Sequence, residues 1–337
     1  MKIPVFSAAE LAELLEMKKV IAGVEAVYRL KAEGETAVWP LVAYEFDRYD
    51  AVMDIRSGCV LGDINVHGAK LLNNFPHNKE QGKQPFTGML MVFDSTTGHP
   101  IGVMDASYIT GMRTGAAGAL GAKYLAKKDA KTLMLLGAGR QAFFQIGATL
   151  LTVPTIEKVI MTDALFPENA EKFAATAADR LKNELGIDAS GVTFCAASVE
   201  EAAKQADIII TVTPARDPVI KKEWVKPGTH FSCIGSDMEG KEEIDPALFV
   251  GAKVYADDLP QCIRVGEMER PIKEGYIAAD YPKGEIGQLI AGEIVGREND
   301  EEITIFDATG LALLDLVTAK AAITTSEEKE CGQMVTI

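Results

Sequence analysis

The motifs by which cysteine and histidine hold metal ions are absent from this sequence. Its four histidines form no H-x-x-x-H pattern, and no two of its five cysteines form C-x-x-C. Scattered thiols are typical of a reducing cytoplasm and argue against a disulfide framework or structural zinc. We therefore expect a cytoplasmic protein without a metal site.

Long hydrophobic runs and an excess of positive charge are also lacking. No apolar run approaches the roughly 18 residues of a membrane span. The formal net charge is -15 over 337 residues, which argues against nucleic acid or an anionic membrane as partner. The length is enough for two domains with substantial cores, and the hydrophobic share of 47% is ordinary for a soluble protein.

A glycine-rich turn is the most informative motif present. The apolar run 133–136 leads into Gly137-Ala138-Gly139-Arg140-Gln141-Ala142, which fits G-x-G-x-x-A, and a helix-compatible segment follows. The glycines permit a tight turn and a close approach of backbone to phosphates, and the helix start presents free N–H groups to an anion. This context predicts a dinucleotide-binding Rossmann unit.

Asp163 ends the next apolar run, 158–162. A carboxylate there suits the ribose hydroxyls of adenosine and repels a 2′-phosphate, so we expect NAD rather than NADP. The alternative is that Asp163 caps the helix that Pro167 and Glu168 begin.

The order of expected elements gives the domain organisation. Ser7 to Lys19 is predicted as one helix, with Ser7 and Glu10 as a capping box, and β-rich runs between Val38 and Met104 indicate an antiparallel sheet. Strict α/β alternation then predicts a parallel sheet. The predicted fold class is α/β, with a Rossmann-type NAD-binding domain (127–306) plus an α+β substrate-binding and dimerisation domain (1–126, with 307–337 returning). We expect a frayed polar tail after Thr324.

Two cationic residues lie in unusual surroundings. Lys70 interrupts an apolar strand pattern, which is unusual without an anionic partner. It either snorkels to the surface or is a catalytic-site residue that binds a substrate carboxylate or shuttles a proton. Arg113 lies among small residues on a predicted helix. It either clamps a carboxylate with its planar fork or forms an ordinary ion pair between helices.

Polar residues follow two strands of the predicted parallel sheet. Thr211 and Thr213 follow one, and Asp237 follows the next, behind Gly235 and Ser236. The carboxyl ends of parallel strands face the ligand crevice. Asp237 is therefore a candidate catalytic residue, with a loop or helix-cap role as the alternative.

In these motifs the sequence resembles the ornithine cyclodeaminase and mu-crystallin family over nearly the whole chain. The resemblance rests on seven motifs in order: G-x-K at 68–70, N-x-P with a following Asn at 74–78, T-G-x-P at 97–100, I-T-x-x-R-T at 109–114, G-A-G-x-Q at 137–141, G-S-D-x-x-G-K-x-E at 235–243 and F-D-x-T-G-x-A-x-x-D at 306–315.

The resemblance implies roles for these positions. Lys70 and Arg113 would hold a substrate carboxylate, and Asp237 would act as acid/base at the substrate amine. Thr309 and Gly310 would line the substrate pocket. The implied NAD site is made of the turn residues Gly137, Ala138, Gly139, Arg140 and Gln141 together with Thr114, Asp163, Thr211, Thr213, Ile234 and Gly235. The implied assembly is a homodimer joined through the N-terminal sheets.

The ornithine cyclodeaminases of this family carry an extra substrate-binding arginine upstream of G-x-K, for which either Arg48 or Arg56 could serve here. The specific reaction that we expect is that of an ornithine cyclodeaminase, a lyase that forms proline and ammonia from ornithine. The alternative is an oxidoreductase, either an alanine-type dehydrogenase or a ketimine (imine) reductase, and a non-catalytic ligand-binding protein like mu-crystallin is a rival of another class. Family members act on amino acids or cyclic imines through a nicotinamide.

Overall fold

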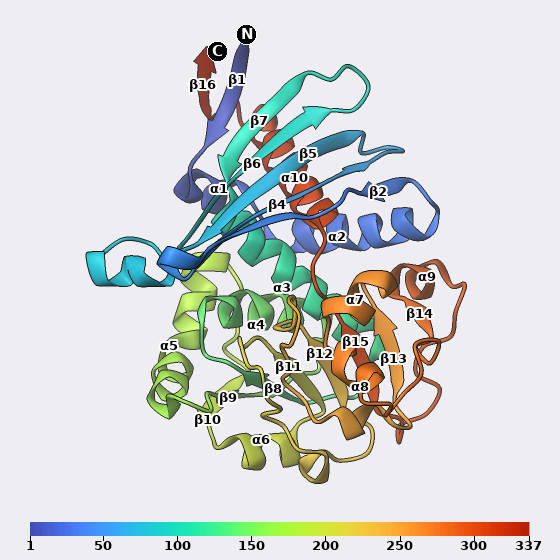
Figure 1. The fold of residues 1–337 in the computed structure, drawn as a ribbon. Coiled ribbons are helices and arrows are strands. Elements are labelled where there is room, and N and C mark those ends of the chain that lie inside the picture. The colour runs from blue at the N-terminus through green and yellow to red at the C-terminus, as the bar shows by residue number, and fades with distance from the viewer. Residues whose placement is uncertain (337) are drawn as a thin grey trace. The chain divides into compact units, whose positions relative to one another are not determined.

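The computed structural model describes residues 1–336, and its contacts divide the chain into two compact units. The first unit is Met1–Arg113 together with the segment from Leu311 onward, and the second is Thr114–Gly310. Figure 1 shows their elements. In the part of the chain that the structure covers, no helix is long and apolar enough to cross a membrane.

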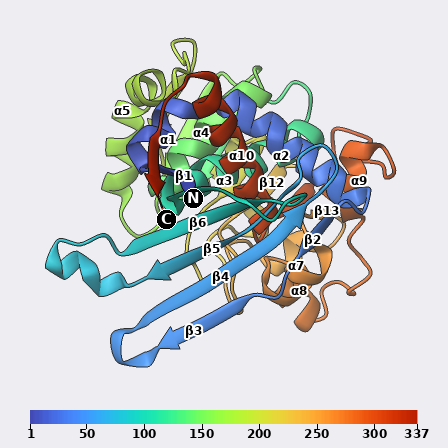
Figure 2. The same ribbon diagram turned by 90° about the horizontal axis from the view of Figure 1, so that it is seen from above.

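A mixed eight-stranded sheet forms the frame of the first unit. Its order is β16-β1-β7-β6-β5-β4-β2, with β3 beside β4. The bounds are β1 (Lys2–Phe6), β2 (Thr36–Val38), β3 (Val42–Phe46), β4 (Ala51–Val60), β5 (Val66–Asn74), β6 (Phe86–Asp94), β7 (Pro100–Asp105) and β16 (Gln333–Thr336). The pairings from β2 to β7 are antiparallel, as the alternating pattern predicted. Figure 2 shows β3 to β6 side by side.

The prediction of a frayed tail was wrong, because β16 pairs with the first strand. Lys2 to Val5 of β1 lie opposite Thr336 to Gln333, and β1 also pairs in parallel with β7. Both termini therefore lie at one edge of the sheet (Figure 1). Sequence patterning missed both strands because the backbone hydrogen bonds that stabilise them join opposite ends of the chain.

Four helices belong to the first unit in whole or in part. They are α1 (Ala8–Leu14), α2 (Met17–Ala32), the first turns of α3 (Ala106–Leu125) and α10 (Ala312–Glu328). The predicted capping box is present, since Ser7 Oγ accepts from the Glu10 backbone N–H. The single helix predicted over Ser7–Lys19 is wrong, because Leu15 and Glu16 adopt extended backbone between α1 and α2. Helix α10 packs on β4, β5 and α2.

The second unit is built on a parallel sheet of order β10-β9-β8-β11-β12-β15-β13-β14. Its strands are β8 (Thr132–Leu136), β9 (Lys158–Thr162), β10 (Thr193–Ala196), β11 (Ile208–Thr211), β12 (His230–Cys233), β13 (Lys253–Ala256), β14 (Gly284–Glu285) and β15 (Thr304–Asp307). The order β10-β9-β8-β11-β12 is the doubly wound 3-2-1-4-5 arrangement, so the predicted Rossmann-type fold is confirmed.

The helices of this unit connect its strands. They are the later turns of α3, then α4 (Arg140–Thr152), α5 (Pro167–Leu185), α6 (Val199–Gln205), α7 (Leu259–Val265), α8 (Glu269–Lys273) and α9 (Ile286–Ala291). Buried strands such as β11 are almost wholly apolar, as expected when helices cover both faces of a sheet.

The division between the units falls inside α3 and just before α10. The boundaries that we expected from sequence, after residues 126 and 306, differ from it. In α3, Thr110 lies within hydrogen-bonding distance of Lys70 on β5, whereas Gly115 and Gly118 lie against Phe144 and Gln145 of α4. Successive turns of one helix therefore belong to different units.

Candidate functional site

Lys70 is fully buried on β5 of the first unit. Its Nζ donates to Asp315 Oδ2 of α10 at 2.7 Å, and Thr110 Oγ1 lies 3.4 Å away. The alternative that Lys70 snorkels to the surface is therefore wrong. The buried ammonium depends on these partners for its stabilisation, because burying an isolated charge is very costly.

Asp315 joins Lys70 to Arg113. Arg113 Nε lies 3.3 Å from Asp315 Oδ1, and the Arg113 side chain is 9% exposed. This contact is an ion pair between α3 and α10, which is the simple alternative left open for Arg113. Sequence reasoning gave Asp315 no role, although a carboxylate in the apolar helix pattern of 311–323 was a signal that a buried cation would lie beside it.

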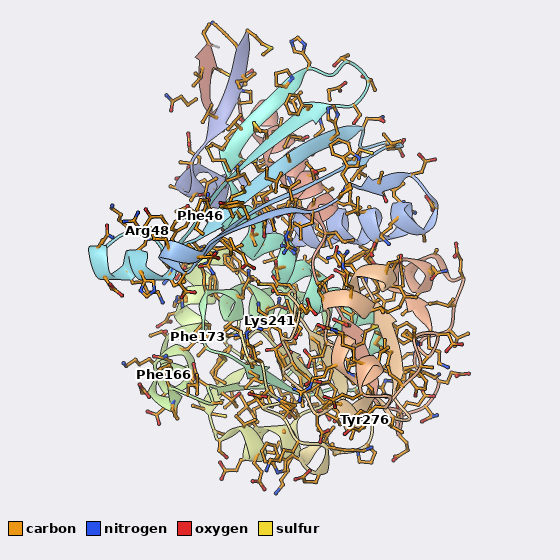
Figure 3. All side chains as sticks on the ribbon, viewed as in Figure 1. Phe46, Arg48, Phe166, Phe173, Lys241 and Tyr276 are labelled. Carbon is orange, nitrogen blue, oxygen red and sulfur yellow. The ribbon has the colours of Figure 1, made fainter. Side chains whose placement is uncertain are left out.

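The strand register decides which upstream arginine joins this group. Arg56 on β4 lies directly opposite Lys70 on β5. Its side chain is only 15% exposed and lies 3.5 Å from Asp54. Arg48, labelled in Figure 3, lies on the exposed turn η1 (Asp47–Tyr49) that follows β3, beyond the pairing of Phe46 with Ala51. We call Arg56, Lys70, Arg113 and Asp315 the cationic cluster.

Burial and charge act against each other in the cationic cluster. Burial lowers the pKa of Lys70 to about 8, although Asp315 acts to raise it, and the charges of Arg113 and Arg56 lower it further. Burial also acts to raise the pKa of Asp315, but the charges of Arg113 and Lys70 outweigh it and the pKa lies below its usual value. Lys70 and Arg113 share the single carboxylate of Asp315, so two cations meet one carboxylate. The excess of one positive charge suits an anionic ligand.

In the second unit, the glycine-rich turn links β8 to α4 with the geometry that a dinucleotide needs. Gly137 has φ +105°, and an added Cβ would lie 3.0 Å from Thr213. Gly139 is the N-cap of α4, so no side chain caps this helix. A Cβ added at Gly139 would have no atom within 4 Å. Ala142 is fully buried, and its small side chain allows α4 to pack closely.

The residues of this turn fit a pyrophosphate. The first N–H groups of α4 have no side-chain acceptor at the cap, and the space above Gly139 is open. Gln141 Oε1 is buried and has no hydrogen-bond partner among residues 1–336. The residues present are therefore suited to a dinucleotide.

Asp163 lies directly after β9, and its Oδ1 accepts from the backbone N–H groups of Leu165 and Phe166 at 3.1 and 2.9 Å. It is not the N-cap of α5, because that position is Phe166. Instead of capping the helix, Asp163 forms a turn that holds the loop before α5. This turn orders the carboxylate at the carboxyl end of β9.

The threonines near the strand ends have different surroundings. Thr211 is fully buried and donates its hydroxyl to Glu243 at 2.6 Å, whereas Thr213 Oγ1 accepts from Ala215 N–H at 3.2 Å. Ile234 N–H bonds Thr211 O. Thr114 Oγ1 is buried without a partner in the described residues. The Thr211 hydroxyl is therefore already engaged within the protein.

Asp237 lies in the loop after β12 and is 37% exposed. Its Oδ1 accepts from Lys241 Nζ at 2.6 Å, and Lys241 also reaches Gly235 O. Figure 3 labels Lys241 in the second unit. The next helical segment, η4 (Pro246–Phe249), is capped by Asp245, so Asp237 is not a helix cap.

Thr309 and Gly310 end the second unit and are held by a buried carboxylate that sequence reasoning missed. Asp257 Oδ2 accepts from Gly310 N–H at 2.8 Å, and Oδ1 accepts from Thr309 N–H and Oγ1 at 3.2 Å. Gln261 Nε2 donates to Thr309 Oγ1 at 2.7 Å. Across residues 1–336, no group of three or more His, Cys, Asp and Glu side chains is arranged to hold a metal ion.

The parallel sheet and its glycine-rich turn define a Rossmann-type dinucleotide-binding protein with an additional α+β unit. The chain belongs to the ornithine cyclodeaminase/mu-crystallin family, whose family model matches residues 2–330. The resemblance stated from the sequence motifs is thus confirmed.

Individual relatives match along the whole chain. Alanine dehydrogenase of Archaeoglobus fulgidus is 36% identical over 335 residues, which cover 99% of this chain and 98% of that protein. A solved archaeal alanine dehydrogenase dimer with bound NAD has a TM-score of 0.90 and 34% identity, and the match covers 100% of both chains. The Thermococcus litoralis Delta(1)-pyrroline-2-carboxylate reductase, solved with NADH and L-proline, has a TM-score of 0.90 and 31% identity, with 98% of this chain and 99% of that chain covered.

Proposed function

We propose that this protein is an NAD-dependent enzyme that acts by hydride transfer at the Cα–N bond of a small L-amino acid with one carboxylate, or at the corresponding imine. The observation that carries this proposal is the buried pair Lys70 and Arg113 of the cationic cluster, which share one carboxylate and so leave one positive charge for the carboxylate of a substrate. Similarity to an alanine dehydrogenase and to an imine reductase solved with NADH supports the same reaction class.

Residues of the first unit hold the substrate in this proposal. Lys70 and Arg113 donate to the substrate carboxylate, with Arg56 as the third cation. Asp315 orients both donors and keeps them charged in the core. Fixing the carboxylate fixes Cα, which lowers the entropic cost of reaching a reactive geometry.

Residues of the second unit hold the cofactor and move a proton. Gly137 to Gln141 bind the pyrophosphate, and Asp163 binds the adenosine ribose. NAD supplies the hydride chemistry when bound. Asp237 accepts a proton from the substrate ammonium, because only a neutral amine is able to form an imine, and it releases Lys241 as it does so.

Ornithine cyclodeamination is the second candidate function. It requires a place for the side-chain ammonium of ornithine in addition to the carboxylate. Asp54 Oδ1 is buried without a hydrogen-bond partner in the described residues, and such an atom is suited to accept from an ammonium. We rank the dehydrogenase first, because the close relative with 36% identity is an alanine dehydrogenase.

One experiment separates the two candidates. The purified protein is incubated with NAD and L-alanine or L-ornithine, while ammonia and reduced cofactor are followed together. We expect L-alanine to yield one NADH for each ammonia. Ammonia without accumulated NADH, with L-ornithine as substrate, would assign the cyclodeaminase. Binding of NAD and carboxylates without turnover of any amino acid or imine would leave a ligand-binding protein.

A homodimer through the first-unit sheet is also part of this proposal. Residues that point away from Lys70 on β5 and β6 leave an exposed apolar face, with Leu71 at 36%, Met89 at 61% and Met91 at 46% exposure. Exposed apolar patches of this kind mark interaction sites. The related archaeal alanine dehydrogenase was solved as a dimer. Met89→Lys and Met91→Lys should shift the mass measured by light scattering towards a monomer.

A further inference from the structure

Two carboxyl groups outside the proposed reaction lie beneath the loop that carries Asp237. Glu243 and Glu267 are both fully buried in the second unit. Glu243 lies at the end of this loop, and Glu267 lies between α7 and α8. Neither residue was a candidate from sequence, because nothing in the local pattern shows that residues 24 positions apart meet.

Glu243 ties the carboxyl ends of β11 and β12 together. Its Oε2 accepts from Thr211 Oγ1 at 2.6 Å and from Gly235 N–H at 3.0 Å, and its Oε1 accepts from Thr213 N–H at 2.6 Å. A Cβ on Gly235 would overlap both Glu243 Oε2 and Thr213 O. The glycine before Ser236 and Asp237 is therefore required by this carboxylate, since only glycine lets the oxygen reach the backbone.

Glu267 holds both ends of the same loop. Its Oε2 accepts from the Ser236 hydroxyl, and its Oε1 accepts from Glu243 N–H and Ile244 N–H at 2.7 Å each. Ser236 directly precedes Asp237. The loop is thus fixed at Gly235, at Ser236 and at its return to Ile244 by two carboxyl groups.

Burial acts on the pKa of both carboxyl groups. Burial raises the pKa of Glu243, and burial together with the charge of Glu243 raises the pKa of Glu267 well above its usual value. Glutamine at position 267 keeps the size of the side chain but replaces one of the two accepting oxygens with an NH₂ group, which is not able to accept from Ser236 or from the backbone N–H groups.

We infer that Glu243 and Glu267 are positioning residues that hold the backbone of Gly235 and Ser236 so that Asp237 is aimed at the substrate amine. This inference rests on the proposed function, because it assumes that Asp237 moves the proton. Neither glutamate touches substrate or cofactor in this account. Their whole effect passes through the orientation of Asp237.

The test is a double-mutant cycle on turnover. Glu267→Gln and Ser236→Ala are each made alone and together with Asp237→Asn. In the wild-type background we expect each to lower kcat by about tenfold, while KM and the NAD dissociation constant stay within about twofold. In the Asp237→Asn background the same changes should alter the residual rate by less than about twofold, because there is no carboxylate left to aim.

Asp207→Asn is the matched control. Asp207 is also a largely buried carboxylate that accepts two backbone N–H groups, from Lys131 and Thr132, but it lies at the amino end of β11 rather than at the carboxyl ends of the strands. Asp207→Asn should change kcat by the same factor in the wild-type and the Asp237→Asn backgrounds. Equal effects of Ser236→Ala and Glu267→Gln in both backgrounds would overturn the inference while leaving the proposed function intact. Full activity of Asp237→Asn would overturn both. Ser236→Ala removes only a hydroxyl, so it serves if Glu267→Gln does not fold.

Discussion

Lys70 and Arg113 in the first unit meet a buried carboxylate of opposite charge, whereas Glu243 and Glu267 in the second unit lie near one another with backbone N–H groups and hydroxyls as their donors. The first arrangement keeps its charges and leaves one positive charge for a ligand. In the second arrangement the pKa of both carboxyl groups is raised, and their oxygens accept hydrogen bonds from the loop. In the function that we propose, burial of charge serves recognition in the first unit and positioning in the second.

The largest effect is expected at Asp237, the partly exposed carboxylate that follows the residues held by Glu243 and Glu267. Asp237→Asn keeps the shape and removes the base. A positioned acid/base typically contributes about 10² to 10⁴ in rate, and we expect kcat to fall within that range while NAD still binds. Steady-state kinetics with NADH binding by fluorescence checks this. Unchanged turnover would return Asp237 to a structural ion pair with Lys241.

Asp315→Asn should be the most damaging substitution for the stability of the first unit. It leaves Lys70 and Arg113 buried without their shared counter-ion, and breaking a buried pair costs about 3–5 kcal/mol. Urea unfolding measures the loss. Glu184→Gln, which breaks an exposed pair with Arg180, is the control and should cost about 0.3–0.5 kcal/mol. Similar losses in both variants would contradict the role given to Asp315.

The charge of Lys70 should make carboxylate binding depend on pH. Its pKa is lowered to about 8, so the ammonium is present below that pH and lost above it. With NADH saturating, the dissociation constant of propionate should rise with pH above about 8, by up to tenfold per unit. Lys70→Arg should flatten this rise, because arginine stays protonated. A wild-type affinity that is constant up to pH 10 would exclude Lys70 from the binding site.

Asp163→Ser should have the smallest effect, confined to cofactor choice. The carboxylate at the end of β9 would repel a 2′-phosphate, and serine would not. The hydroxyl still accepts one of the two N–H groups that hold the loop. The NADP dissociation constant should fall several-fold and that for NAD should rise slightly. Equal wild-type affinity for NAD and NADP would show that Asp163 does not face the ribose.

Local patterns predicted the parts of this molecule whose causes are local. The Ser7 cap and the Gly137 turn follow from neighbours in sequence. The choice between Arg48 and Arg56 depended on strand register, and the pairing of β1 with β16 on the meeting of the two termini.

Local sequence patterns did not predict the buried partners of the candidate site, because these partners lie far away in the chain. Asp315 lies 245 positions from Lys70 in the chain, and Asp257 lies 53 positions from Gly310. A carboxylate that serves as counter-ion or loop anchor has the same sequence signature as any acidic residue in a loop or helix. The fold alone shows which cation or N–H it meets.

Transfer of the Cα hydrogen tests the central claim most directly. L-alanine deuterated at Cα is oxidised with NAD, and the reduced cofactor is isolated and its deuterium content measured. The account predicts that NADH carries one deuterium. It also predicts that deuteration slows turnover under conditions in which hydride transfer limits the rate. Reduced cofactor without deuterium, or ammonia release with the deuterium lost to water, would contradict hydride transfer at Cα.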